Sequence, residues 1–199
     1  MNDIVPSSSS AIRRNLWPLL AGLLVLASWG LLVFELFERR PPDVGYVATP
    51  PEVVAAMVEL ADVKDGDVVY DLGCGDGRLA IAAARRGATV RGVGIDIDPD
   101  RVAEARDAAH AAGLADRLTF RRADIFREDL RPASVVMMYL ATTVNERLLP
   151  QFEQLRPGTR IVSYTYSIPG VKPAREVSVR SADGVEHRLL LWITPLTRE

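Results

Sequence analysis

The stretch that decides the fold, "VVYDLGCGDGRLAIAAARRG", runs from Val68 to Gly87. Its apolar start predicts a buried strand at 68–72, and a helix is predicted at 78–86, where Gly87 ends it. A strand, a tight glycine turn and a helix in this order form the start of a βαβ unit, so the stretch predicts an α/β fold. The turn contains three glycines, Gly73, Gly75 and Gly77.

The rest of the chain continues this alternation and predicts a doubly wound sheet. A closing turn with Asp183 and Gly184 predicts an antiparallel hairpin. The expected fold class is therefore α/β, with a mostly parallel, Rossmann-like, seven-stranded sheet and an antiparallel C-terminal hairpin. Residues 117–124 alternate in polarity, as in an edge strand. The other expected strands are 89–96, 134–140, 160–166, 175–180 and 186–194, and the other expected helices are 49–61, capped by Thr49, 98–113, capped by Asp98, and 143–158, disturbed by Pro150.

Composition excludes several functional classes. The formal charge of −2 and a pI near 5.8 provide no basic field, so nucleic acid is not expected as a partner. Cys74 is the only cysteine, which excludes an intrachain disulfide and a C-x-x-C site and fits a reducing cytosol. His110 and His187 have no companions at metal-ligand spacing, so no metal site is predicted and both are interpreted as structural.

The amino-terminal region predicts a membrane anchor. Residues 15–34 carry no charge over about 20 residues, enough to cross a bilayer as a helix. A buried core helix and a cleaved signal peptide are the alternatives, but the segment is apolar all round and no small-residue cleavage pattern follows it. The expected organisation is a disordered tail at 1–14, a transmembrane helix at 15–37, a linker at 38–45 and a catalytic domain at 46–199.

The orientation of that anchor does not follow from charge. Arg13 and Arg14 on one side balance Arg39 and Arg40 on the other, whereas the positive-inside rule needs an asymmetry. The cofactor inferred below is cytosolic, which places the catalytic domain inside. With its arginine-rich, lysine-poor composition, the chain is expected to be a single-pass protein of a bacterial inner membrane, with the domain facing the cytoplasm.

Three carboxylates end three consecutive predicted strands. Asp71, Asp96 and Asp124 are 25 and 28 residues apart, one βα unit each. Because the carboxyl ends of parallel strands meet at one edge of a sheet, the three acids are expected to line the ligand crevice side by side.

The charge of this crevice selects the ligand. A dinucleotide would place its pyrophosphate on the turn, beside Asp71 and Asp76, at a cost of several kcal/mol at an effective ε near 20. The spacing is also G-x-G-x-G, not the G-x-G-x-x-G of dinucleotide folds. S-adenosylmethionine bears an ammonium and a sulfonium but no phosphate, and is the expected cofactor.

The motifs "VVYDLGCGDGR", "GVGIDIDPDRV" and "FRRADIF" resemble those of class I S-adenosylmethionine-dependent methyltransferases. The resemblance implies that Asp71 holds the methionine ammonium and that the loop, with Cys74 as a small filler, passes under the methionine part. It also implies that Asp96 accepts the ribose hydroxyls, next to Ile97. Asp124 would accept from the adenine amino group, with Ile125 in contact.

Within that class the chain resembles the small membrane-anchored lysine methyltransferases that modify mitochondrial carrier and ATP synthase c-subunit proteins, and their bacterial relatives. "GYVATPPEVVAAMVELA" and "MMYLATTVNERLLP" carry the likeness. It implies that Tyr46 and Tyr139 orient the acceptor amine as catalytic residues. The expected partner is a protein lysine at the membrane surface. A small-molecule or lipid acceptor and, less favoured, a nicotinamide-dependent oxidoreductase stay open.

Overall fold

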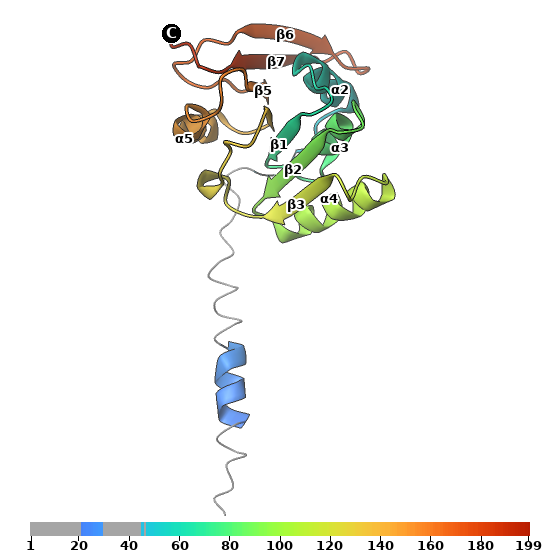
Figure 1. Cartoon of the computed structure of the whole chain (residues 1–199), viewed down its shortest axis with the longest axis vertical. Coiled ribbons are helices and arrows are strands. Elements are labelled where there is room, and N and C mark those ends of the chain that lie inside the picture. The colour runs from blue at the N-terminus through green and yellow to red at the C-terminus, as the bar shows by residue number, and fades with distance from the viewer. Residues whose placement is uncertain (1–20, 30–44, 46) are drawn as a thin grey trace, which may run out of the picture. The chain divides into compact units, whose positions relative to one another are not determined.

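The computed structural model describes residues 21–29, 45 and 47–199, and the chain divides into two units, 1–41 and 42–199. The second unit alternates strands with helices (Figure 1). Its helices are α2 (Pro51–Leu60), α3 (Arg78–Ala84), α4 (Pro99–Ala111), the 3₁₀ turn η1 (Ile125–Arg127) and α5 (Thr142–Phe152). Its strands are β1 (Val68–Leu72), β2 (Arg91–Asp96), β3 (Leu118–Arg122), β4 (Val135–Met138), β5 (Arg160–Tyr164), β6 (Arg175–Arg180) and β7 (Glu186–Ile193).

The strands form one sheet in the order β3-β2-β1-β4-β5-β7-β6. The first five are parallel, and β7 pairs antiparallel with both β5 and β6. The order changes direction at β1, which lies between β2 and β4, so the ligand crevice of such a sheet is expected beyond the end of β1. The predicted seven-stranded α/β fold is confirmed, with β3 at an edge.

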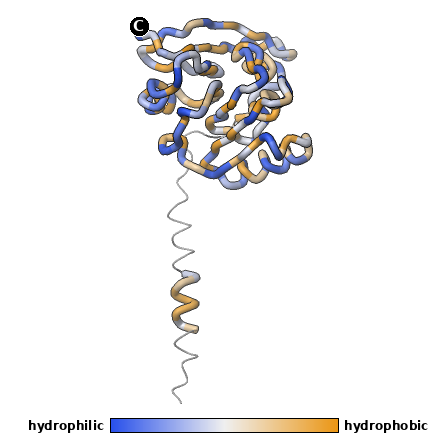
Figure 2. The backbone as a smooth tube through the Cα atoms, viewed as in Figure 1, coloured by the Kyte–Doolittle hydropathy of each residue, from blue (hydrophilic) through white to orange (hydrophobic). Residues whose placement is uncertain are grey.

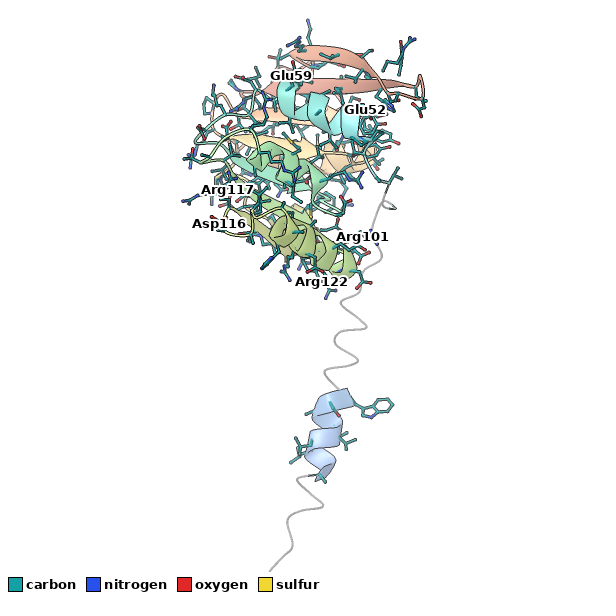
Figure 3. All side chains as sticks on the ribbon, turned by 90° about the vertical axis from the view of Figure 1, so that its right-hand side faces the viewer. Glu52, Glu59, Arg101, Asp116, Arg117 and Arg122 are labelled. Atoms are coloured by element: carbon teal, nitrogen blue, oxygen red, sulfur yellow. The ribbon has the colours of Figure 1, made fainter. Side chains whose placement is uncertain are left out.

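Helices cover both faces of the sheet (Figures 1 and 3). On one face, α2 and α3 pack against alternate residues of the central strands, such as Val69 and Met137, and α3 and α4 pack against Leu118 and Phe120. On the other face, α5 packs against Tyr70 and its neighbours. Every residue of β4 is buried, since this strand is covered on both sides.

Figure 3 labels residues at the two opposite ends of the parallel strands. Glu52 and Arg101, in the first turns of α2 and α4, lie with Arg122, the last residue of β3, at the edge where the parallel strands end. Glu59 and Arg117 lie at the opposite edge. The connections that lead from each parallel strand to the next helix therefore gather at the carboxyl ends of these strands, which is where the candidate site lies.

Local capping differs in part from expectation. Asp98 caps α4 as predicted, its Oδ1 accepting from the amide of Asp100 at 2.9 Å. Thr49 does not cap α2: the N-cap is Pro50, which makes no side-chain cap. The carbonyl oxygen of Thr49 instead accepts a 2.7 Å hydrogen bond from the Arg78 guanidinium. The segment before α2 is thus tied to the helix that follows the glycine turn.

The predicted membrane localisation is wrong for the residues that the structure describes. Within residues 21–29, 45 and 47–199, every helix is too short or too polar to cross a membrane. Of the span predicted at 15–37, the structure describes residues 21–29, which are helical and largely apolar (Figure 2). Residues 15–20 and 30–37, the tail at 1–14 and most of the linker at 38–45 lie outside the described residues. For the described residues, the prediction of a single-pass inner-membrane protein is therefore wrong.

Candidate active site

The site is built on the end of β1 and the turn after it. The amides of Gly73 and Cys74 both donate to the carbonyl oxygen of Ile95 on β2, at 2.9 and 3.0 Å, and so hold the turn against the neighbouring strand. Gly77 begins α3 with a φ of +78°, in the left-handed region that favours glycine. A Cβ at Gly77 would lie 2.8 Å from the ring of Phe120, so glycine is required there by both conformation and space.

Asp71 is a buried carboxylate without a complete set of partners. It is 1% exposed, and its Oδ2 has no hydrogen-bond partner among the described residues. Burial raises the pKa of Asp71 to about 7, and the carboxylates of Asp96 and Asp76 add to this shift. A buried anion with an unpaired oxygen is costly unless a cation or donor pairs with it. Asp71 therefore fits a site for a positively charged ligand group.

Asp96 lies at the end of β2 and holds two backbone amides. Its Oδ2 accepts from Gly75 at 2.9 Å and its Oδ1 accepts from Asp98 at 3.0 Å. A carboxylate oxygen has about two acceptor positions, so each oxygen retains capacity for a ligand hydroxyl. The half-buried Asp96 is thereby fixed in orientation by the glycine turn, with Ile97, also half-buried, directly after it.

Asp124 follows β3 and begins the 3₁₀ turn. Its Oδ1 accepts from the amide of Phe126 at 3.0 Å, and its Oδ2 lies 3.7 Å from Nε of Arg127. The amide of Ala123 donates to the carbonyl oxygen of Asp96 at 2.9 Å, which joins the ends of β2 and β3. The three acids therefore lie at the ends of neighbouring strands, and both Asp124 and Ile125 are half-buried there.

Cys74 is a packing residue by its surroundings. It is 5% exposed, and burial raises the pKa of its thiol far above the usual range, with Asp71 and Asp96 raising it further. A thiol of this kind stays protonated at neutral pH and is a poor nucleophile. The interpretation of Cys74 as a small filler is consistent with this environment.

Asp76 is held by Arg78. The guanidinium Nε donates to both carboxylate oxygens, at 2.9 and 3.1 Å, and the same guanidinium reaches Thr49. The carboxylate of Asp76 nevertheless raises the pKa of Asp71, so Asp76 still contributes negative charge to the site.

Tyr139 lies at the far side of the site, directly after β4. Its ring centroid is 4.2 Å from that of Tyr164 and 6.0 Å from that of Tyr166. Burial raises the pKa of the Tyr139 phenol, and the phenols of Tyr164 and Tyr166 raise it further. Tyr46, the other predicted catalytic residue, lies outside the described residues.

Three residues of this cluster were missed in the sequence. Tyr164 and Tyr166 are two residues apart in the sequence, at the end of β5 and just after it, and this pair of aromatic residues was a signal available in the sequence. His187 was interpreted as structural, and the structure places it at the start of β7, beside the end of β5. No sequence pattern brings β7 between β5 and β6, so the contact of His187 with Tyr164 required the structure.

This strand order, with a glycine turn after the first strand and acids at the strand ends, defines a class I S-adenosylmethionine-dependent methyltransferase. The family model described as "ANTKMT methyltransferase domain" matches residues 71–175. The chain belongs to this family, and it is an S-adenosylmethionine-dependent methyltransferase, as the motifs predicted.

Individual relatives agree with this assignment. A "Protein-lysine N-methyltransferase" of Saccharolobus islandicus (strain REY15A) is 40% identical over 76% of this chain and 94% of its own length. The "Adenine nucleotide translocase lysine N-methyltransferase" of Mus musculus is 32% identical over 79% of this chain and 69% of its own. A crystal structure described as an RNA methyltransferase from Salinibacter ruber in complex with S-adenosyl-L-homocysteine is 47% identical, with a TM-score of 0.69 over 75% of this chain and 94% of that one.

Proposed function

We propose that this enzyme methylates a lysine side chain of a protein substrate. The observation that carries the proposal is a group of three tyrosines at the ends of β4 and β5: Tyr139 follows β4, Tyr164 ends β5 and Tyr166 lies just after it. Aromatic faces stabilise a cationic or partly cationic amine, and phenol oxygens accept its hydrogens. The names of the Saccharolobus and mouse relatives support the same acceptor.

The cofactor is proposed to bind along the three acids. Asp71 would pair with the methionine ammonium, a role supported by its unpaired, buried Oδ2. Asp96 would accept from the ribose hydroxyls, since its orientation is fixed by two backbone amides. Asp124 would accept from the adenine amino group. The turn would lie under the methionine part, and the remaining proposed contacts are Gly73, Cys74, Gly75, Gly77, Ile97 and Ile125.

The chain contributes mainly alignment and charge to the reaction. When bound, S-adenosylmethionine supplies a methyl group activated by its sulfonium. A nitrogen nucleophile must approach that methyl in line, as a neutral amine, so positioning is the main contribution of the protein. The tyrosine cluster would orient the amine, and Tyr46 is proposed to join it. The boundaries 46–199 for the catalytic domain stay a prediction.

The acceptor is tested by labelling. The full chain is incubated with methyl-labelled S-adenosylmethionine and an extract of the source organism, and the products are divided into protein, RNA and small-molecule fractions. We expect label in protein, recovered as methyllysine after acid hydrolysis and identified by mass spectrometry.

The same fractions contain the outcomes that contradict the proposal. Label in RNA would follow the name of the Salinibacter structure, although a chain of net charge −2 lacks the basic field expected of an RNA-binding enzyme. Label in extractable metabolite or lipid would establish a small acceptor. In either case the lysine proposal is wrong, while the methyltransferase assignment stands.

A further inference from the structure

A chain of hydrogen bonds leads from the tyrosine cluster to the β6–β7 turn. The hydroxyl of Tyr164 lies 2.7 Å from Nδ1 of His187, and Nε2 of His187 lies 2.8 Å from the hydroxyl of Ser181. Ser181 in turn donates to the carboxylate of Asp183. Tyr164, His187 and Ser181 are each at most 9% exposed, so the chain is shielded from water until it reaches Asp183.

The direction of each bond follows from the last group in the chain. Hydrogen bonds from Ser181 and from the backbone of Val185 hold the pKa of Asp183 below its ordinary value, so this carboxylate is ionised and only accepts. Ser181 therefore gives its one hydrogen to Asp183 and must accept from Nε2 of His187. For a neutral imidazole this leaves the other nitrogen unprotonated, with Nδ1 accepting and Tyr164 donating.

This direction leaves the oxygen of Tyr164 able to accept a further hydrogen bond. The side chain of Tyr164 lies on the same face of the sheet as that of Asp71, the face that α2 covers. The ring of Tyr139 packs against the ring of Tyr164 there. Tyr164 pairs with Leu189 in the antiparallel β5–β7 ladder, so His187 lies at the edge where the parallel strands end. The ring centroids of Tyr164 and Tyr166 lie 4.2 and 6.0 Å from that of Tyr139, so the three phenol rings are neighbours.

We propose that the hydroxyl oxygen of Tyr164 accepts a hydrogen from the acceptor amine, and that His187 and Ser181 are positioning residues that fix the direction of the Tyr164 hydrogen. The proposal rests on the proposed function, because it assumes a nitrogen acceptor. It assigns no covalent step to the chain.

The chemical reason is the single lone pair of the nucleophile. A neutral amine attacks the methyl group with that lone pair, so a phenol hydrogen aimed at the nitrogen would compete for it. A phenol that donates to His187 cannot do so, and its oxygen instead holds an N–H and turns the lone pair away from Tyr164. The hydrogen-bond chain Tyr164–His187–Ser181, called the relay below, thus prevents the phenol from donating its hydrogen to the amine nitrogen. This is a contribution to alignment.

Substitutions test the relay in the full chain. Tyr164→Phe keeps the ring and removes the hydroxyl, and we expect kcat for methyllysine formation to fall about 100-fold, with the affinity for S-adenosylhomocysteine unchanged. Ser181→Ala should lower kcat by a smaller factor at unchanged KM for the cofactor, and Ser181→Thr should restore it, because only the hydroxyl is needed. Tyr70→Phe is the matched control: it removes a hydroxyl from a tyrosine that is 5% exposed on the opposite face of the sheet.

A second measurement determines the direction of the His187 hydrogen bonds and does not require catalytic activity. The chain has two histidines, so ¹⁵N NMR of the imidazoles in an untagged protein, assigned with His110→Gln, reports the tautomer of His187. We expect Nε2 protonated and Nδ1 unprotonated in the wild type.

The outcomes separate this inference from the proposed function. Wild-type protein that forms no methyllysine contradicts the proposed function. Wild-type protein that forms it, with Tyr164→Phe equally active or unable to bind S-adenosylhomocysteine, overturns the relay alone, as does the opposite tautomer of His187.

Discussion

The guanidinium of Arg78 bridges two parts of the site, donating 2.7 Å to the carbonyl oxygen of Thr49 and pairing with the carboxylate of Asp76. Thr49 precedes α2 and Asp76 belongs to the glycine turn. One side chain therefore holds the segment before the fold-deciding motif against the start of α3.

Loss of this bridge is expected to loosen both segments. Arg78→Met should lower the free energy of unfolding by about 1 kcal/mol, because a hydrogen bond from a charged donor is lost in a partly exposed setting. It should also weaken the binding of S-adenosylhomocysteine, since the glycine turn loses its link through Arg78 to the segment before α2. Urea unfolding and calorimetric titration measure the two effects.

A matched control separates the bridge from the loss of any surface arginine. Arg188→Met removes an exposed ion pair with Glu176, which contributes about 0–1 kcal/mol, and should leave ligand binding unchanged. Equal behaviour of the two variants would show that the Arg78 contacts have no special role.

The buried Asp71 is expected to make stability fall as pH rises. Its pKa is raised to about 7 in the folded state from an ordinary 3.8, so the folded protein holds a proton that the unfolded chain has lost. The stabilisation is complete below the unfolded pKa and disappears as pH passes through the folded pKa. Relative to Asp71→Asn, the wild type should lose about 4 kcal/mol of unfolding free energy between pH 4 and pH 8. Parallel curves for the two proteins would contradict this.

The same ionisation should control cofactor affinity. A cationic ammonium pairs with the ionised carboxylate, so binding below pH 7 must first remove the Asp71 proton. We expect the affinity for S-adenosylhomocysteine to fall about tenfold per pH unit below that point. Isothermal titration at several pH values would show it, together with proton release on binding. In Asp71→Asn the affinity should be lower and independent of pH over this range.

The Cys74 thiol is expected to be unreactive in the folded protein. Its burial and raised pKa keep it protonated and shielded. Iodoacetamide at pH 8 should add no mass to the native chain and one adduct to the chain in urea, since Cys74 is the only cysteine. Cys74→Ala should retain methyl transfer, whereas a loss of chemistry with intact cofactor binding would make the thiol a participant.

Gly77→Ala is expected to destabilise the turn for two reasons. The left-handed φ of +78° disfavours any side chain, and the new Cβ would lie 2.8 Å from Phe120. Together these should lower the free energy of unfolding by about 2–4 kcal/mol. Gly158→Ala is the control, because its φ is +85° with open space around it, and should cost about 1 kcal/mol. If urea unfolding gives both variants a similar decrease in the free energy of unfolding, the contact with Phe120 does not contribute to the effect.

Some parts of the site depend on local sequence patterns, and others depend on contacts between distant strands. The acids at 71, 96 and 124 follow predicted strands, so local periodicity and the rule for parallel sheets placed them at one edge. The membrane prediction, which is wrong for the described residues, depended on a count of apolar residues over about 20 positions, and such a count measures hydropathy alone.

The sequence by itself determined the strand–turn–helix motif, because that motif depends on neighbours in the chain. It also determined the negative charge of the crevice and hence the cofactor, because each acid follows a strand and parallel strands end at the same edge of a sheet. The tertiary structure alone decided that β7 lies between β5 and β6, and so that His187 meets Tyr164 from 23 residues away. Pairing of distant strands depends on which faces bury one another, and no local pattern records that choice.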